Sequence, residues 1–416
     1  MRRCFPHLQS PAVQQADLFG NCVSCRTAQL YFEGDSCMLR RIAFFGLPAA
    51  LLALGLVLAG CSLSGDNGDD DDKTGPDTAI PPGPTSPDAV VDRLQKYLSR
   101  EDFESLFPRR IGAPGWIAEM PHWCFPNWED YPDYYSYDNL IEAAREMAHW
   151  TYTIEYRDLG GDPLLSNSRG YITHKGTGKE YPVYSGENYD APWNQDKPAA
   201  KKVYDYGAFI GEGTDNDRRR ELAGLLANMA HETGGGWPGA PGGEESWGFF
   251  FNEETSHNDP GHYCDTYTDF ASKDYPPTPG ASYHGRGGIQ LSWNYNYGPF
   301  SIMAFNGDRQ KLLDDPDIMD TDGKLGFMSG LWFWMTPQLP KPSCHEVILS
   351  GWQPNANQAG KGWKYGFGAT IMVINGGFEQ GGNQKPRRVN HYRDLAAKTG
   401  ADISGEQITT DGMSIL

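Results

Sequence analysis

Residues 225–239 read LLANMAHETGGGWPG, a stretch that starts with the pattern of an amphipathic helix and ends in three consecutive glycines. Apolar residues at i, i+3, i+4 and i+7 predict one buried helix face: Leu222, Leu225, Leu226 and Met229. Glu232 lies seven residues past Leu225, so the same spacing puts its carboxyl on that face. Burial and the carbonyl oxygens of a last helical turn both favour a protonated carboxyl, as a general acid requires. The alternative is a structural glutamate at the rim of the core.

Length and composition bound the class of protein. The 416 residues, 39% hydrophobic and 13% aromatic, suffice for one large domain or two average ones. The net charge of −19 argues against a nucleic-acid partner, because phosphate binding needs a basic surface. The aromatic excess suggests stacking on sugar faces, although core packing explains most aromatic side chains in most proteins.

Residues 38–60 predict a lipoprotein signal peptide. A charged Met-Leu-Arg-Arg start precedes a long apolar run, and the Leu-Ala-Gly-Cys that ends at Cys61 resembles the bacterial lipobox, in which the cysteine is lipidated. An uncleaved membrane anchor is the alternative, since the run has about the length of a membrane span. We expect a lipid-anchored protein of the bacterial cell envelope, on the outer membrane if the host is Gram-negative, or one released extracellularly. Residues 1–37, upstream of a complete signal, are interpreted as an overextended gene start.

The segment after the lipobox is a linker. Residues 61–88 are rich in Asp, Gly, Pro, Ser and Thr, cannot bury apolar area, and predict a disordered tether. Beyond it remain Cys124, Cys264 and Cys344, so at most one disulfide forms among them, and the sequence leaves the pairing open.

After residue 88 the pattern is mostly helical, with long loops. Helical spacing occurs in the residue ranges 88–108, 135–150, 218–232, 324–336 and 345–352. Residues 170–184, GYITHKGTGKEYPVY, contain two β-rich runs around a glycine-containing turn and predict one small β-hairpin.

Three ordered segments point to a family. They are HETGGGW (231–237), WGFFFNEE (247–254) and YHGRGGIQLSWNYNYG (283–298). Together they resemble the glycoside hydrolase family 19 chitinases, which show HETTGGW, a WGYCF segment before a second glutamate, and YYGRGPIQLSxNYNYG. Later blocks match in the same order, so that the resemblance covers residues 94–400: WFWMTP (332–337), KPS (341–343) and INGG (374–377).

The resemblance implies a mainly α, lysozyme-like, two-lobed domain with a substrate groove over residues 89–404, followed by a C-terminal tail, 405–416. Residues 152–206 look like an insertion relative to compact family members. We predict that this insertion extends one wall of the groove or lengthens a subsite.

The resemblance also implies catalytic roles. Glu232 matches the family's general acid and Glu254 its general base; the neighbouring Glu253 is disfavoured by its spacing from the tryptophan. Inversion at a glycosidic bond needs a protonated carboxyl and an ionised one about 6.5–9.5 Å apart, with water between them. Ser292 matches the serine that helps Glu254 hold that water, or else it is a buried hydroxyl bonded to backbone. Arg388 matches an arginine that pairs with groove carboxylates, with Arg387 as the competing choice.

The substrate-binding set that the resemblance implies comes from the same motifs. Its members are His231, Gln290, Tyr295, Asn296, Lys341, Asn375 and Glu379. Ordinary alternatives exist for Asn375 as a turn residue and for Lys341 as a solvated lysine. Trp293 and Tyr297 are interpreted as packing residues.

No metal or cofactor is expected. The zinc-protease motif HExxH would need histidine at position 235, which is Gly235. A loop group with no recurring ligand spacing is interpreted as structural: His257, His262, Cys264 and Asp265. The chain departs from the family pattern at Gly234, Phe250, His284 and Gly288, and Phe250 removes one family disulfide.

The expected function is therefore that of an endo-chitinase, a glycoside hydrolase that cleaves β-1,4-linked N-acetylglucosamine polymers or oligomers with inversion, as a monomer without a nucleic-acid partner. The alternatives are a peptidoglycan hydrolase and a surface carbohydrate-binding protein with weak catalysis. The intact Glu232, Glu254 and Ser292 argue against a pure binding protein.

Overall fold

The computed structural model describes residues 82–119, 131–157, 163–254, 259–268 and 273–416. The predicted signal peptide, Cys61, residues 61–81 of the predicted linker, Cys124 and His257 lie outside these residues, so these assignments stay predictions; the last linker residues, Pro87 and Asp88, belong to helix α3 (Pro87–Tyr97). Within the described ranges no helix has both the length and the apolar character that crossing a bilayer requires.

The described part of the chain is mainly helical, as predicted, and contains one sheet. The helices are α3 (Pro87–Tyr97), α4 (Arg100–Leu106), α5 (Pro114–Glu119), α6 (Tyr137–Met147), α7 (Asp215–Glu232), α8 (Asn294–Ala304), α9 (Lys311–Asp314), α10 (Ile318–Thr321), α11 (Gly323–Met335), α12 (Cys344–Ile348), α13 (Ala356–Gly360), α14 (Phe367–Glu379) and α15 (Pro386–Thr399). The strands are β1 (Trp150–Arg157), β2 (Ser168–His174), β3 (Lys179–Ser185) and β4 (Ala199–Asp205). The predicted helix over 88–108 is two helices, because Ser99 forms a capping box with Asp102 and starts α4.

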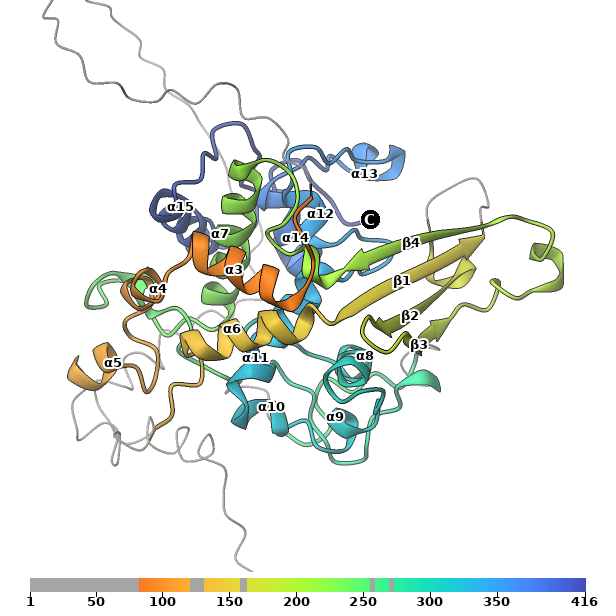
Figure 1. The fold of residues 1–416 in the computed structure, drawn as a ribbon, viewed down its shortest axis with the longest axis horizontal. Helices are drawn as coiled ribbons and strands as arrows, with labels where there is room; N and C mark the ends of the chain where they lie inside the picture. The colour runs from red at the N-terminus through yellow and green to blue at the C-terminus, as the bar shows by residue number, and fades with distance from the viewer. Residues whose placement is uncertain (1–81, 120–130, 158–162, 255–258, 269–272) are drawn as a thin grey trace, which may run out of the picture.

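Helix α7 is the centre of the helical body (Figure 1). It begins with a capping box between Thr214 and Asp217, and every side chain from Arg220 to Ala230 is buried. The sequence predicted one buried face, but the helix is covered all round, as a central helix is. Helix α15 packs along it, and α12, α14 and α11 also contact it. The end of α7, at Glu232, is therefore held by several helices at once.

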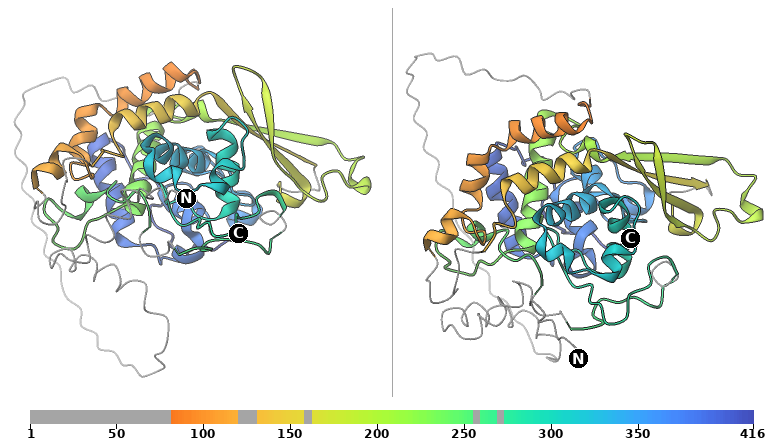
Figure 2. Two further views of the ribbon diagram at one scale, coloured as in Figure 1. Left: turned by 90° about the horizontal axis from the view of Figure 1, so that it is seen from below. Right: turned by 60° about the horizontal axis from the view of Figure 1, so that its bottom comes forward.

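The sheet extends from one side of the helical body in all three views (Figures 1 and 2). Its strand order is β3-β2-β1-β4, with all neighbours antiparallel. The hairpin predicted over residues 170–184 is β2 with β3 and is confirmed; β1 and β4 extend it into a sheet that the sequence did not predict. The helical pattern predicted over 135–150 ends early, at Met147, and Trp150 starts β1. Tyr152 on β1 is opposite Ile172 on β2, and both side chains are buried.

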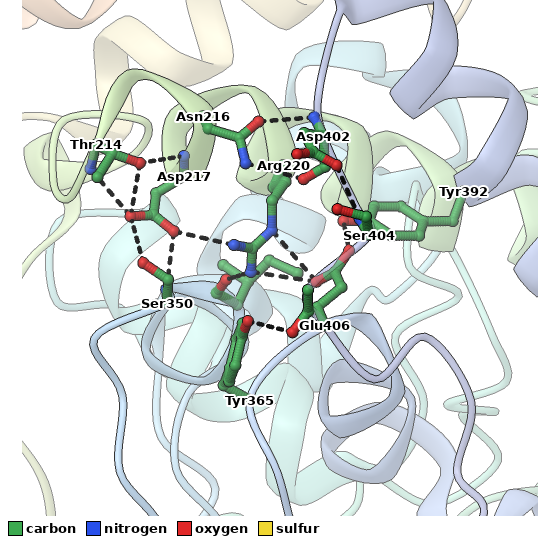
Figure 3. Close-up of polar contacts among 12 residues, drawn as sticks. Thr214, Asn216, Asp217, Arg220, Ser350, Tyr365, Tyr392, Asp402, Ser404 and Glu406 are labelled. Atoms are coloured by element: carbon green, nitrogen blue, oxygen red, sulfur yellow. Dashed lines mark hydrogen bonds and ion pairs between the residues drawn. The ribbon is translucent and has the colours of Figure 1, made fainter. Parts of the chain in front are cut away.

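A buried ion-pair network fastens the start of α7 to the rest of the molecule (Figure 3). Arg220 contacts Asp217 at 3.2 Å and Glu406 at 3.1 Å, and all three side chains are almost completely buried. Asp217 also accepts hydrogen bonds from the backbone N–H and hydroxyl of Ser350 at 2.8 and 3.0 Å, and Tyr392 of α15 donates its hydroxyl to Glu406. The network joins α7, α15 and residues near the C-terminus.

Glu406→Gln tests this network. The neutral amide leaves the buried Arg220 without one of its carboxylates, so the free energy of unfolding should fall by about 3 kcal/mol in urea denaturation at neutral pH. Asp394→Asn is the matched control, because Asp394 pairs with Lys398 on the surface, where the two side chains are 42% and 48% exposed. That control should change the stability by less than about 1 kcal/mol. Equal stability of the two variants would contradict the role given to Glu406.

Candidate active site

A cavity of about 860 Å³ lies beside the end of α7 and brings most of the predicted site together. Its lining includes eight residues that the sequence singled out: Glu232, Glu254, Gln290, Ser292, Tyr295, Asn296, Lys341 and Asn375. These side chains come from five separate parts of the chain: the end of α7, the segment before residue 255, the region from 290 to 296, the loop after α11, and α14.

The end of α7 is fixed by Thr233. Its hydroxyl donates to the carbonyl of Met229 at 2.7 Å and accepts the N–H of Phe249 at 2.9 Å, while its own carbonyl accepts the N–H groups of Phe250 and Phe251. The segment that leads to Glu254 is thus bonded to the turn that follows Glu232. The two glutamates are held in relation to each other by these main-chain bonds.

Phe250 takes the place of a family disulfide by packing. Its ring lies on Gly235, where an added Cβ would sit 2.5 Å from the ring carbon Cγ. Edge and tilted contacts with Trp247 and Phe251 complete the cluster. The glycine run after α7 therefore admits an aromatic ring that supports the segment carrying Glu254.

Arg388 is the buried partner of Glu232. Its guanidinium contacts the Glu232 carboxyl at 2.5 Å and the Glu379 carboxyl at 2.7 Å, and it donates to Asn228 at 3.0 Å. The Arg388 side chain is 1% exposed, whereas Glu232 is 21% exposed and reaches the cavity. Burial acts to lower the pKa of Arg388, but Glu232 and Glu379 outweigh it and raise that pKa. The sequence considered the apolar face and the helix end around Glu232 and matched Arg388 to an arginine that pairs with groove carboxylates; the structure puts Arg388 in direct contact with Glu232.

Glu379 and Asn375 form a second layer around this arginine. Burial acts to raise the pKa of Glu379, but Arg388 and hydrogen bonds from the Lys385 N–H and the Asn375 amide outweigh it and lower the pKa. Asn375 has non-helical backbone angles within α14 and lines the cavity, whereas Glu379 is buried. The predicted contact of Glu379 with substrate has no support in this geometry, because its carboxylate is used by Arg388.

The two adjacent glutamates of the second segment point to different places. Glu253 contacts the imidazole of His284 at 3.0 Å. It also lies near the buried Asp320: burial is the main cause that raises the pKa of Asp320, and the charge of Glu253 adds to it against the opposing charge of Arg286. Glu254 lines the cavity, and its N–H donates to the carbonyl of Gly285 at 2.7 Å. The choice of Glu254 over Glu253 thus agrees with the geometry.

Gln290 and Trp293 hold Ser292 in a strained turn. Both have positive φ angles, 51° and 77°, which side chains other than glycine rarely adopt. The Ser292 hydroxyl donates to the Gln290 carbonyl at 3.0 Å, and Asn296 donates its amide to the Ser292 carbonyl at 2.9 Å. The backbone bond foreseen as the alternative for Ser292 is present, and the side chain still lines the cavity.

Several aromatic residues of the cavity were not predicted as site residues, among them Trp293, Tyr263 and Phe378. Trp293 is 36% exposed and stacks on Tyr295 with a ring separation of 5.8 Å. Burial, together with the charge of the hydrogen-bonded Glu254, raises the pKa of Tyr263 to about 12. Phe378 is 84% exposed beside the cavity. Trp293 lies inside a quoted motif and could have been found there; Tyr263 and Phe378 carry no comparable signal.

Lys341 and His231 differ in their placement. Lys341 lines the cavity, but its ammonium donates to the Val373 carbonyl at 2.5 Å, and burial lowers its pKa. His231 is not part of the cavity lining; its ring lies near that of His391, and burial followed by the charge of Arg388 lowers its pKa well below the usual value. A substrate contact of His231 is therefore not supported.

The loop group interpreted as structural has local partners. Asp265 accepts the N–H groups of Tyr267 and Thr268, and the thiol of Cys264 faces main-chain carbonyls. Cys264 and Cys344 are both free. In the described ranges, no three His, Cys, Asp or Glu side chains gather as a metal site would require.

Much of the chain is similar to known proteins. The family described as chitinase class I of glycoside hydrolase family 19 matches residues 190–403. The chain is 44% identical over 198 residues to an endochitinase of Carica papaya, which covers 45% of this chain and 77% of the papaya protein. It is 46% identical over 244 residues to a basic 30 kDa endochitinase of Solanum lycopersicum, covering 57% and 69% of the two chains.

Among solved structures, chitinase C from Streptomyces griseus HUT6037 aligns with a TM-score of 0.44 and 23% identity, over 75% of this chain and 97% of that chain. The family match, which spans half of the sequence, decides the class: a glycoside hydrolase. The chain belongs to the family 19 chitinases.

Arg388→Met tests the ion-pair site. Glu379 and Glu232 would remain partly or fully buried without their cation, so unfolding at pH 7 should require roughly 3 kcal/mol less. Because the folded pKa of Glu379 is lowered from 4.5, its contribution is present above that pH and is lost as the pH falls through the folded pKa. The stability difference between wild type and variant should therefore shrink in acid, which denaturation at several pH values would show.

Arg387→Met is the matched control for this prediction. Arg387 contacts Glu244 at 3.2 Å with a side chain that is 23% exposed, so its loss should lower the stability by less than about 1 kcal/mol. A pH-independent loss in Arg388→Met, or a similar loss in both variants, would be the contrary result.

Proposed function

We propose that the chain is an endo-acting chitinase that hydrolyses β-1,4-linked N-acetylglucosamine chains with inversion, with Glu232 as general acid and Glu254 as general base. The observation that supports this most is that both carboxyls line one cavity, while Glu253 does not line it and contacts His284 instead. An inverting glycosidase needs two such groups on opposite sides of a bond, with space for water at the base.

The surroundings of the two carboxyls support different roles. Glu232 sits at a helix end against buried apolar residues and a single arginine, in a position defined by the core. Glu254 lies in a loop next to a tyrosine hydroxyl, and Ser292 lines the same cavity. A base that activates water benefits from polar neighbours that also orient the water. Arg388 contacts the acid directly and we assign it a role in orienting that carboxyl.

The size and lining of the cavity favour a polymeric sugar. At about 860 Å³ it is near the upper end of ligand pockets, which span about 300–1,000 Å³. Trp293 and Phe378 offer exposed aromatic surface for sugar faces, and Gln290, Asn296 and Asn375 offer amides for hydroxyl and acetamido groups. We propose that chitin or its oligosaccharides occupy this groove.

Single amide substitutions test the catalytic pair on chitin hexamer. Glu232→Gln and Glu254→Gln should each lower kcat by at least about a hundredfold, because a positioned acid or base contributes about 10²–10⁴-fold. Glu253→Gln is the matched control, since it makes the same change one residue away from Glu254; it should retain most of the activity. NMR of fresh products from the wild type should show the α-anomer first.

Several results would contradict the proposal. Undiminished cleavage by Glu232→Gln would show that Glu232 is not the general acid, and an initial β-anomer would exclude inversion. Rapid cell-wall digestion without hexamer cleavage would favour a peptidoglycan hydrolase instead. Hexamer binding without turnover by the wild type would leave a carbohydrate-binding protein.

The insertion supplies one wall of the groove. Five of its residues line the cavity: Tyr152, Leu165, Ile172, Val183 and Tyr184. The same cavity is also lined by Pro299 of α8 and Trp332 of α11. Most of the wall residues are buried, but Leu165 is 41% exposed, so a sugar that lies along this wall would cover it. We propose that the sheet adds a subsite for longer oligomers.

Leu165→Ala tests this wall. The loss of apolar surface should raise KM for chitin hexamer about threefold to tenfold, at about 0.8 kcal/mol per buried methylene, and leave KM for the trimer unchanged. Val203→Ala is the matched control: Val203 is 53% exposed on the same sheet but does not line the cavity. Steady-state kinetics on the hexamer and the trimer measure these changes. Equal changes of KM in the two variants would argue against a subsite on the sheet.

A further inference from the structure

The C-terminal segment, residues 405–416, is built into the domain. Thr410 and Met413 are buried, at 0% and 1% exposure. Backbone bonds join the segment to α14 and to the loop before it: Gly368 donates to Gln407 at 2.8 Å, and Ser414 donates to Lys361 at 2.9 Å. The family match ends at residue 403, so this segment lies beyond the part shared with the family model.

The segment holds the loop between α14 and α15. The Thr410 hydroxyl lies within hydrogen-bonding distance of two acceptors, the Glu379 carbonyl and the Gln384 side-chain oxygen, and can donate its one proton to either. It also accepts the N–H of Gly382 at 3.1 Å. The Thr410 N–H donates to Gln384 at 3.2 Å. Farther along, Gly381 donates to the Met413 carbonyl at 2.8 Å. The start and the end of this loop are therefore both fixed by the C-terminal segment.

The end of α14, directly before this loop, carries the residue that holds Arg388. Glu379 is bonded to Thr410 through its main-chain carbonyl and to Arg388 through its carboxylate, the latter at 2.7 Å. Arg388 in turn contacts Glu232 at 2.5 Å. Four residues thus form a continuous chain of contacts from the C-terminal segment to the carboxyl that we assign as the acid.

The other part of the segment is fastened independently. Glu406 accepts the hydroxyl of Tyr392 on α15 and pairs with Arg220 on α7, as Figure 3 shows. Thr410 contacts the end of α14 and the loop after it. The segment therefore contacts each of the three helices that supply Glu232, Glu379 and Arg388. It is a cross-link among the supports of the acid.

We propose that residues 405–416 are a positioning element of the active site and that the Thr410 hydroxyl, through Glu379 and Arg388, sets the orientation of Glu232. The inference rests on the proposed function of Glu232 as the acid. Proton donation depends steeply on geometry, and a displacement of about 1 Å caused by a distant substitution can cost about a hundredfold in rate. Thr410 acts through other residues and does not line the cavity.

Thr410→Val removes the hydroxyl while keeping the shape of the side chain. On chitin hexamer its kcat should fall about tenfold, with KM changed by less than about twofold, because substrate-binding side chains are untouched. Thr410→Ser keeps the hydroxyl and should retain wild-type kcat. Thr399→Val is the matched control: it is the same change at a buried threonine of α15, whose hydroxyl donates only to its own helix, at Leu395 and Ala396. It should leave kcat near wild type.

Gln384→Ala is a second test, because the half-buried Gln384 is the side chain bonded to the Thr410 hydroxyl. It should reproduce the loss of kcat even if Thr410→Val does not fold. Wild-type kcat in folded Thr410→Val or in Gln384→Ala would overturn the proposal, as would equal losses in Thr410→Val and Thr399→Val. Glu232→Gln, assayed in parallel, separates the two ideas. If it is inactive while Thr410→Val is normal, only the positioning role fails; if it is fully active, the role of Glu232 as acid fails.

Discussion

The buried guanidinium of Arg388 is the interaction on which the rest of the site depends. It lies among Glu232 of α7, Glu379 of α14 and Asn228 of α7, and it comes from α15 itself. A buried charge is tolerated only when it is paired and hydrogen-bonded, so these helices cannot shift independently without exposing an unpaired ion. Glu232, which we propose as the acid, is thereby fixed by the same contact that holds the helical body together at this end. Such a contact fixes the position of the carboxyl, but burying the charged groups costs desolvation free energy. Burial of the surrounding apolar core offsets this cost.

The two carboxyls of the groove are held in different ways. Glu232 belongs to a helix that is buried all round, whereas Glu254 is held by main-chain bonds to Gly285 and by the segment anchored on Thr233. The strained backbone beside Ser292 is maintained by its neighbours in a tight turn, as strain at functional sites usually is. If Glu232 is the acid and Glu254 the base, as we propose, a rigid acid and a base on a supported loop suit a reaction in which water must enter on one side only.

The sheet lies largely outside the family match and the C-terminal segment wholly outside it, and the two contact different parts of the molecule around the site. Residues of the sheet line part of the cavity, where we propose that they add a subsite for longer oligomers. The C-terminal segment lies behind the site and touches the helices that support the acid. Additions at the wall bear on specificity, because they contact the ligand. Additions behind the helices bear on rate, because they restrict the motion of groups that the ligand never contacts.

The sequence by itself determined the helices with clear 3.6-residue spacing, the hairpin, the family and the position of most groove residues, because these signals are local or lie in consecutive motifs. It did not reveal β1, which follows directly on a helical pattern, or β4, whose side chains are mostly exposed; strand formation depends on the partner strand. The motifs already favoured Glu254 over Glu253 and Arg388 over Arg387. Tertiary structure alone decided what surrounds these residues: Glu253 contacts His284 while Glu254 lines the cavity, and Arg387 contacts Glu244 while Arg388 holds Glu232. It also placed the half-buried His231 outside the cavity lining. In each case two residues adjacent in sequence have different surroundings, because distant segments of the chain supply those surroundings. No local sequence pattern records them.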